Sequence, residues 1–260
     1  MEEAIIFHPI VPWLDETAYR TILMMLLDYI IVFGIVILGC SNQKLRPGKA
    51  QNLVEWAVKF ITNYADEMIG PQAPTYYPLL IMLFFYILVG NLMGLIPGLV
   101  SPTSNVNVPL ALALVVFVTE HFNGIRKKGI INYLKHFTGG TGVPGWLKPF
   151  MFFIEIIGEL ARPVSLTFRL FGNIVAKEIL LGVLVMLVVL FWPDLSSHDM
   201  LKKAIAGSLG GFAFLMRPLI IVLGTLVSII QASVFTLLTS IYISAAVQSH
   251  EDHPEEATGH

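Results

Sequence analysis

The stretch PFMFFIEIIGELARPVSLTFRLFGNIVAKEILLGVLVMLVVLFW, residues 149–192, decides the fold. As a single helix it would be about 66 Å long at 1.5 Å per residue, whereas the hydrocarbon core of a bilayer is about 30 Å thick. Such a helix fits a membrane only if it is steeply tilted or bent, and Pro163 could bend it because proline removes a backbone donor. The stretch therefore predicts a long oblique helix in a lipid bilayer.

A second long apolar segment, residues 204–247, contains Pro218 and has the same character. A short connection near Trp192, Pro193 and Asp194 joins the two segments, so we expect them to form a hairpin. Three shorter apolar segments each approach the roughly 20 residues that a transmembrane helix needs: 18–40, 76–97 and 109–125. The pattern predicts an all-α membrane protein with about five spans.

The composition favours the same class. Of the 260 residues, 55% are hydrophobic and only 13% are charged, which is too few for the surface of a soluble protein. The 16 basic and 18 acidic residues nearly cancel, so no overall field favours a nucleic-acid partner. Cys40 is the only cysteine and no Cys/His group has the spacing of metal ligands, so the sequence predicts neither a metal site nor a cofactor.

Segment 48–69 differs from the others because charged residues recur through it among apolar ones. This pattern is typical of an amphipathic helix that lies in the membrane interface. No Pro/Gly linker or internal repeat divides the chain, so we interpret residues 1–260 as one membrane domain that ends in an acidic tail, 248–260. The acidic amino terminus lacks the basic start of a secretory signal, and we expect the mature protein to keep it.

Basic residues gather in two of the predicted connections: Lys44, Arg46 and Lys49 after the first span, and Arg126, Lys127, Lys128, Lys135 and Lys148 after the third. The connection between them, 98–108, has none. Cytoplasmic loops of membrane proteins carry an excess of Lys and Arg. We therefore expect both basic connections in the cytoplasm, the amino terminus outside and the tail inside.

Segment 149–192 carries charges at or near membrane depth, where they are costly. At about 100° per residue, one stripe of the helix holds Glu155, Glu159, Arg162, Arg169 and Lys177, whereas Glu178 points to the other side. Arg169 has no acid one helical turn away, so no partner within its own helix explains it. Glu155, near the helix end, could equally belong to a structural ion-pair network.

The second long helix presents Gly224 and Gln231 on one side at helical spacing. Gln231 could hydrogen-bond an arginine or water, and a simple bond between helices explains it equally well. Earlier in the chain, Gly90 and Gly94 belong to a run with a small residue at every fourth position. We interpret these glycines as helix-packing positions.

The run PVSLTFRLFGN, residues 163–173, resembles the subunit a signature of F-type ATP synthases. Supporting matches are GNLMGLIP at 90–97, Asn107-Val108, and QASVF at 231–235, so the resemblance spans roughly residues 80–245. It implies a multi-pass stator subunit of a bacterial cell membrane whose hairpin lies against a rotating ring of c subunits. The implied partners also include the peripheral-stalk b subunits and the rest of the ATP synthase, which makes or hydrolyses ATP.

By this resemblance, Arg169 would be the essential arginine that separates two offset half-channels and draws the proton from each arriving ring carboxylate. Its guanidinium stays protonated, which suits that role. Four other positions match the family's proton path: Asn173 and Gln231 close to the arginine, Glu178 in the outer half-channel, and Glu155 on the cytoplasmic side, where the polar stripe adds Glu159.

Two positions depart from common family patterns. Lys177 stands where many members have a small residue, and Gly224 stands where some have histidine. We hypothesise that Lys177 fills the space left at Gly224 and tunes proton binding at Glu178. Asn105 stands where some relatives carry an acid, which disfavours a place for it in the proton path.

Three other classes of protein fit the sequence less well. A self-contained secondary ion transporter often shows inverted repeats and broken helices, and the sequence has neither. A membrane enzyme needs a convergent nucleophile, base or metal, whereas the histidines here are scattered. An inert scaffold leaves Arg169 unexplained. We therefore predict a proton-channel subunit, with Na⁺ as the alternative ion, that has no nucleotide-binding loop and makes no ATP alone.

Overall fold

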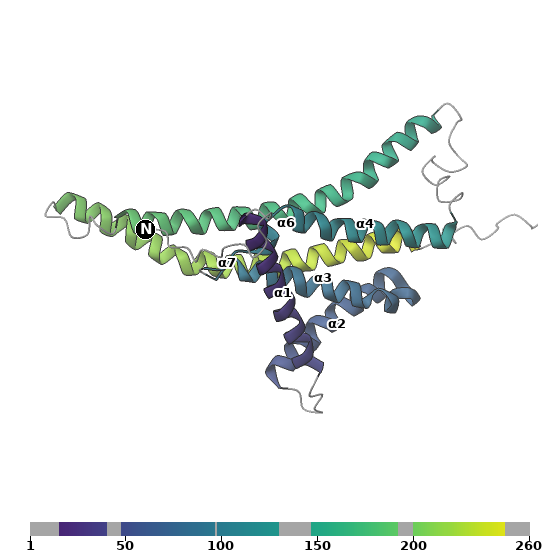
Figure 1. Cartoon of the computed structure of the whole chain (residues 1–260), viewed down its shortest axis with the longest axis horizontal. Helices are drawn as coiled ribbons and strands as arrows, with labels where there is room; N and C mark the ends of the chain where they lie inside the picture. The colour runs from purple at the N-terminus through teal and green to yellow at the C-terminus, as the bar shows by residue number, and fades with distance from the viewer. Residues whose placement is uncertain (1–15, 41–47, 97, 130–146, 192–199, 248–260) are drawn as a thin grey trace, which may run out of the picture. The chain divides into compact units, whose positions relative to one another are not determined.

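The computed structural model describes residues 16–40, 48–96, 98–129, 147–191 and 200–247 (Figure 1). Within these ranges every regular element is a helix, which confirms the all-α class. The α-helices are α1 (Glu16–Cys40), α2 (Lys49–Ile69), α3 (Tyr77–Met93), α4 (Asn107–Lys128), α6 (Lys148–Phe191) and α7 (Met200–Val247). Two short 3-10 helices, η1 (Gly70–Thr75) and η2 (Pro102–Ser104), follow α2 and precede α4. The predicted connection at 192–194 and the acidic tail at 248–260 lie outside the described residues.

Helices α6 and α7 cover the two long apolar segments, with 44 and 48 residues, and each keeps its proline inside the helix. Four of the described helices are long and apolar enough to cross a membrane: α1, α4, α6 and α7. A fifth crossing results if the α2–η1 helix and α3, which meet at an angle of 116°, count as one broken span. The chain is therefore a multi-pass membrane protein by length and composition.

Helix α3 has only 17 residues because it ends at Met93, directly before a turn at Gly94. Glycine is a poor helix former, and the following Pro97 disfavours the helical conformation of the residue before it. The chain then passes through η2 before α4 begins. This irregular stretch brings Ser101 and its neighbours to the site described below.

The chain divides into two compact units, each built from three separate segments. Unit 1 comprises Met1–Ile35, Phe85–Val106 and Arg169–Ala232, and unit 2 comprises Val36–Phe84, Asn107–Phe168 and Ser233–His260. Helices α1, α3, α6 and α7 each contribute a part to both units.

In unit 1, α6 and α7 lie side by side and run antiparallel (Figure 1). Asn173 bonds Gln231 and Lys177 bonds Ser228, so the α7 partner number falls as the α6 number rises. This pairing confirms the hairpin expected from the two long segments. Within the hairpin, Leu170 and Ile174 of α6 and Ala213 of α7 are buried.

In unit 2, α2 buries one apolar stripe at helical spacing, consisting of Ala57, Ile61, Ala65 and Ile69. The end of α2 meets α7, where Ser244 Oγ donates to the Met68 carbonyl at 2.5 Å. A second apolar face of α2 is exposed and includes Leu53 and Trp56. An exposed tryptophan on an amphipathic helix fits the predicted place in the membrane interface, which stays a prediction.

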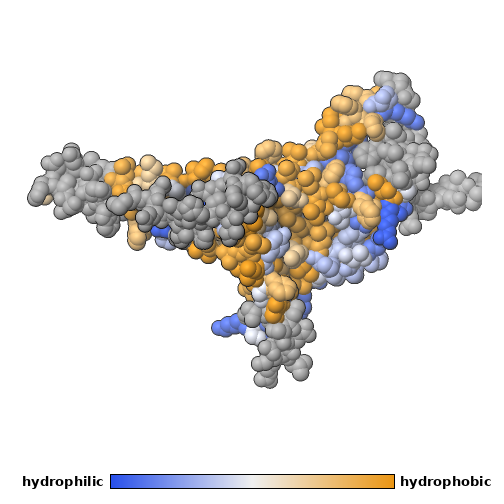
Figure 2. Space-filling model, viewed as in Figure 1, coloured by the Kyte–Doolittle hydropathy of each residue, from blue (hydrophilic) through white to orange (hydrophobic). Residues whose placement is uncertain are grey.

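Hydrophobic residues cover much of the described surface on the face drawn in Figure 2. Large apolar side chains such as Phe168, Met186 and Phe214 are exposed on α6 and α7. An exposed apolar surface of this extent is stable only against lipid or another protein.

Candidate functional site

Arg169 is exposed on α6, in the described part of the chain, and makes no hydrogen bond or ion pair with another described residue. Leu170 and Ile174, four residues apart, are buried on the inner face of the same helix. The periodicity that turns these side chains inward therefore turns Arg169 outward, beside the exposed Phe168. A guanidinium cannot lose its charge, so at this position on an apolar helix its cost is offset only by groups other than the described residues.

Asn173 lies one helical turn after Arg169 and shares its exposed face. Its Nδ2 donates to Gln231 Oε1 at 2.8 Å, and Gln231 is only 4% exposed. The Gln231 Nε2 atom is buried and makes no hydrogen bond within the described residues. The structure thus brings together the two residues that the resemblance places near the arginine, because Gln231 accepts a hydrogen bond from the Asn173 amide.

Glu178 faces the opposite side of α6, toward the stretch that follows α3, as the helical spacing predicted. The backbone N–H of Ser101 donates to Glu178 Oε1 at 3.3 Å. A Cβ atom placed on Gly94 would lie 3.0 Å from Ser101 Cβ, so a larger residue there would push Ser101 by a few tenths of an ångström. A cavity of about 490 Å³ opens beside Glu178, and its lining includes Gly94, Gly182, Arg217 and Ile221.

Lys177 reaches back to α7, where its Nζ donates to Ser228 Oγ at 2.9 Å. Ser228 Oγ in turn donates to the Gly224 carbonyl at 2.7 Å. A Cβ atom on Gly224 would lie 3.5 Å from Lys177 Cδ and 2.7 Å from Leu95 Cδ2. Lys177 therefore packs beside Gly224, but Leu95 lies closer to the position of a Gly224 side chain. The hypothesis that Lys177 fills the space at Gly224 and tunes Glu178 stays a prediction.

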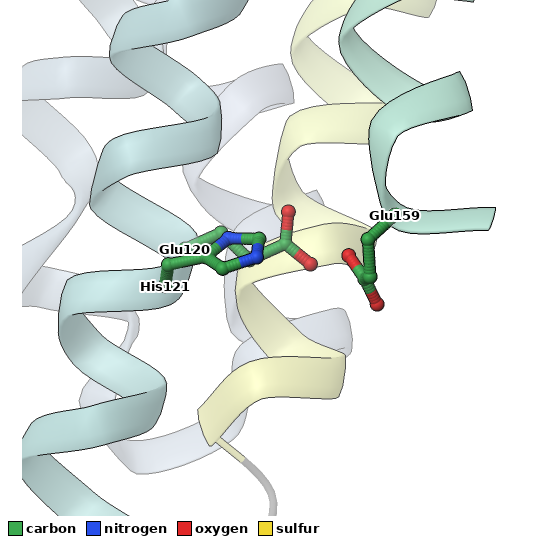
Figure 3. A group of neighbouring side chains, drawn as sticks. All are labelled: Glu120, His121 and Glu159. Carbon is green, nitrogen blue, oxygen red and sulfur yellow. The ribbon is translucent and has the colours of Figure 1, made fainter. Parts of the chain in front are cut away.

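A second group of charged residues lies within unit 2. Glu120 and His121 on α4 converge with Glu159 on α6 (Figure 3), and their potential metal-binding atoms lie within 4.8 Å of one another. Spacing along the sequence could not predict this group, because its members come from two helices. Arg162 Nη1 contacts Glu120 Oε1 at 2.5 Å and Glu159 Oε2 at 2.9 Å, so the two carboxylates already have a cation.

Arg162 also stacks over the Tyr242 ring of α7, with Cζ 5.1 Å from the ring centroid. The arginine thereby joins α4, α6 and α7 through one ion pair between helices and one cation–π contact. Glu155, one turn before Glu159, is half-buried and has no hydrogen bond or ion pair with a described residue. For Glu159 the geometry thus agrees with a structural ion pair, and Glu155 lies outside that network.

Two buried acids did not enter the sequence-based site, namely Glu120 on α4 and Asp28 on α1. Each lies inside a segment that hydropathy predicted to cross the membrane, 109–125 and 18–40. An acid in the middle of an apolar segment is itself a signal of function or pairing. The sequence therefore contained a signal that could have identified both Glu120 and Asp28.

The model of the ATP synthase A chain family matches residues 22–244. Curated proteins named ATP synthase subunit a are similar to this chain: the subunit a 1 of Pelobacter propionicus is 39% identical over 90% of this chain and 88% of its own length. The subunit of Geotalea daltonii is 39% identical over the same shares, and that of Desulfotalea psychrophila 39% over 89% and 85%. The chain therefore belongs to the ATP synthase A chain family, the membrane-embedded, proton-transporting a subunits of F-type ATP synthases.

Proposed function

We propose that this chain conducts protons through two offset half-channels that meet at Arg169, and that a rotating ring of c subunits carries each proton between them. The proposal rests on one observation above all: Arg169 is exposed on an apolar helix and unpaired within the described chain. The cost of a bare guanidinium in lipid disappears if a carboxylate of the ring faces it.

Arg169 favours the ionised form of that ring carboxylate, because two opposite charges attract strongly where water is scarce. Each arriving carboxyl group therefore releases its proton near Arg169 and binds another after it has passed. The same fixed charge repels a proton that approaches directly from one half-channel to the other. Asn173, held by Gln231, offers its polar edge on the same face and orients the groups that pass.

Glu178, with the adjacent cavity of about 490 Å³, belongs to the outer half-channel in this scheme. Glu155 and Glu159 lie toward the cytoplasmic end, since the basic connection before α6, which contains Lys127 and Lys135, is expected in the cytoplasm. Along α6 a proton route thus meets Glu178, Arg169 and Glu155 in turn. The amino terminus is outside, and the c ring, the b subunits and the catalytic sector are the partners in a bacterial cell membrane.

Lys177→Gly should change the pH dependence of ATP-driven proton pumping, because Lys177 sits next to Glu178 in sequence and packs beside Gly224. A cation removed from beside an acid alters how readily that acid holds a proton. The measurement is the initial pumping rate in sealed vesicles across a pH series. Lys59→Gly, an exposed change on α2, serves as the control. An unchanged profile in Lys177→Gly would refute the tuning role.

The dependence of conduction on the ring tests the function as a whole. Vesicles that contain the membrane sector with its c ring, stripped of the catalytic sector, should conduct protons when a potential is applied. Vesicles that contain this chain alone should conduct no more than empty vesicles, because half of the path is missing. Ring-independent conduction would instead favour a self-contained secondary transporter.

A further inference from the structure

Asp28 is a fully buried carboxyl group in the apolar helix α1, with 0% of the residue exposed. Neither of its carboxyl oxygens has a hydrogen-bond partner within the described residues. The hydroxyl of the neighbouring Tyr86 is buried and unpartnered as well. Burial of a carboxyl group without compensation is costly, so a purely structural role would leave this residue unexplained.

Glycine leaves room for the Asp28 carboxyl group. A Cβ atom on Gly90 would lie 3.0 Å from Asp28 Oδ2, which is closer than side chains normally approach. Gly94, one helical turn later, would place a Cβ atom 3.5 Å from Glu178 Oε1, an ordinary contact distance. The interpretation of this run as simple helix packing therefore omits that Gly90 accommodates a carboxyl group.

Ser101 lies between Gly90 and Glu178. Its hydroxyl donates to the Gly90 carbonyl at 2.7 Å, and its backbone N–H donates to Glu178 Oε1 at 3.3 Å. Ser101 is itself buried and also contacts Thr103 Oγ1 at 2.7 Å. Ser101 thus contacts Glu178 directly, whereas the Asp28 carboxyl group lies against Gly90 on the other side of this contact.

A separate cavity of about 180 Å³ lies along α1, on the side of Ser101. Its lining consists of Thr17, Arg20, Thr21, Met24, Val100 and Ser101. Thr17, Thr21 and Met24 follow helical spacing, and Asp28 is the next position on that stripe. A space of this size accommodates several water molecules, each of which needs only about 10–15 Å³.

We propose that Asp28 is a second proton-carrying carboxyl group of the outer half-channel, loaded from the α1 cavity and placed before Glu178. The inference rests on the proposed function and adds a residue and an entrance to it. A hydronium ion from the cavity gives its proton to the Asp28 carboxylate and leaves as water. The protonated carboxyl group then releases that proton toward the Glu178 carboxylate, which restores the Asp28 anion.

Few other charged or titratable groups surround Asp28 in the described part of unit 1. Tyr86 faces it from α3 and Tyr29 adjoins it on α1, with the two rings 5.0 Å apart. Arg20 lines the cavity, and Glu178 lies beyond Ser101. Asp28 is therefore the acid on the cavity side of Ser101 and the group there best suited to accept a proton.

Asp28→Asn, which keeps the shape of the side chain and removes its proton exchange, should lower passive proton flux through the membrane sector about 100-fold, the low end of the 10²–10⁴-fold that positioned acid–base groups typically contribute. The loss should depend on pH, and Asp28→Glu should restore most of the flux. Glu67→Gln, on an exposed acid of α2, is the matched control. Flux is measured in vesicles with the assembled complex, and the amount of this chain per complex is checked.

Wild-type flux and pH profile in an assembled Asp28→Asn complex would overturn the proposal. An equal loss at every pH that Asp28→Glu does not relieve would also overturn it, because it would assign Asp28 to packing. Arg169→Ala, tested for ATP-driven pumping in the same vesicles, separates the two hypotheses. If Arg169→Ala keeps coupled pumping, the proposed function itself fails. If Arg169→Ala does not pump and Asp28→Asn behaves like the wild type, only the proposed role of Asp28 is refuted.

A second measurement covers the case in which Asp28→Asn does not assemble. With the single native cysteine changed to serine, Met24→Cys places a thiol in the cavity and Leu26→Cys places one on an exposed apolar face. A water-soluble, thiol-specific reagent added from the outer side should block flux only in Met24→Cys. Unblocked flux in Met24→Cys would show that the cavity is not on the proton route and would overturn the proposal.

Discussion

Replacing Arg169 by alanine should abolish ATP-driven proton pumping by the assembled complex. The guanidinium is exposed in the middle of α6 and has no partner within the described chain. Without it, ring carboxyl groups keep their protons as they pass, and no fixed charge separates the half-channels. We expect pumping at the background of the assay and an increased passive leak through the membrane sector.

The measurement uses sealed vesicles, with ATP hydrolysis and proton uptake recorded on the same preparation. Arg126→Ala, which removes an exposed arginine at the end of α4, is the matched control and should pump normally. Arg169→Lys should pump poorly, because an ammonium lacks the planar fork of donors that a guanidinium offers a carboxylate. Normal coupled pumping by an intact Arg169→Ala complex would exclude the half-channel mechanism.

Replacing Arg162 by alanine should destabilise the assembled chain, because it removes the cation shared by Glu120 and Glu159. Glu120 is 3% exposed, so its carboxylate would remain buried without a counter-charge. Breaking a buried ion pair from one side typically costs about 3–5 kcal/mol. The contact with Tyr242 on α7 would be lost as well.

The expected result is a lower thermal midpoint of the detergent-solubilised complex and a smaller fraction of this chain retained in it. Arg162→Ala combined with Glu120→Gln should recover much of the loss, because the uncompensated carboxylate is then gone. Arg126→Ala again controls for the removal of an arginine. If Arg162→Ala melts like the wild type, the network is not a stabilising element.

The sequence by itself determined the fold class, the long hairpin and the lack of a partner for Arg169 on its own helix. These conclusions depend on local quantities, namely the length of apolar runs, helical periodicity and the cost of a charge in lipid. The same rules placed Asn173 beside Arg169 and Glu178 on the opposite face of α6. These rules apply to residues on a single helix, because the relative directions of their side chains follow from a rotation of about 100° per residue.

Only the tertiary structure decided which residues of different helices meet. Asn173 with Gln231, Lys177 with Ser228, and Arg162 with Glu120 are separated in sequence by 58, 51 and 42 positions. No periodicity within one helix encodes such pairs, because they depend on how two helices are rotated and shifted against each other. For the same reason, the space at Gly90 that admits Asp28 became visible only once α1 was packed against α3.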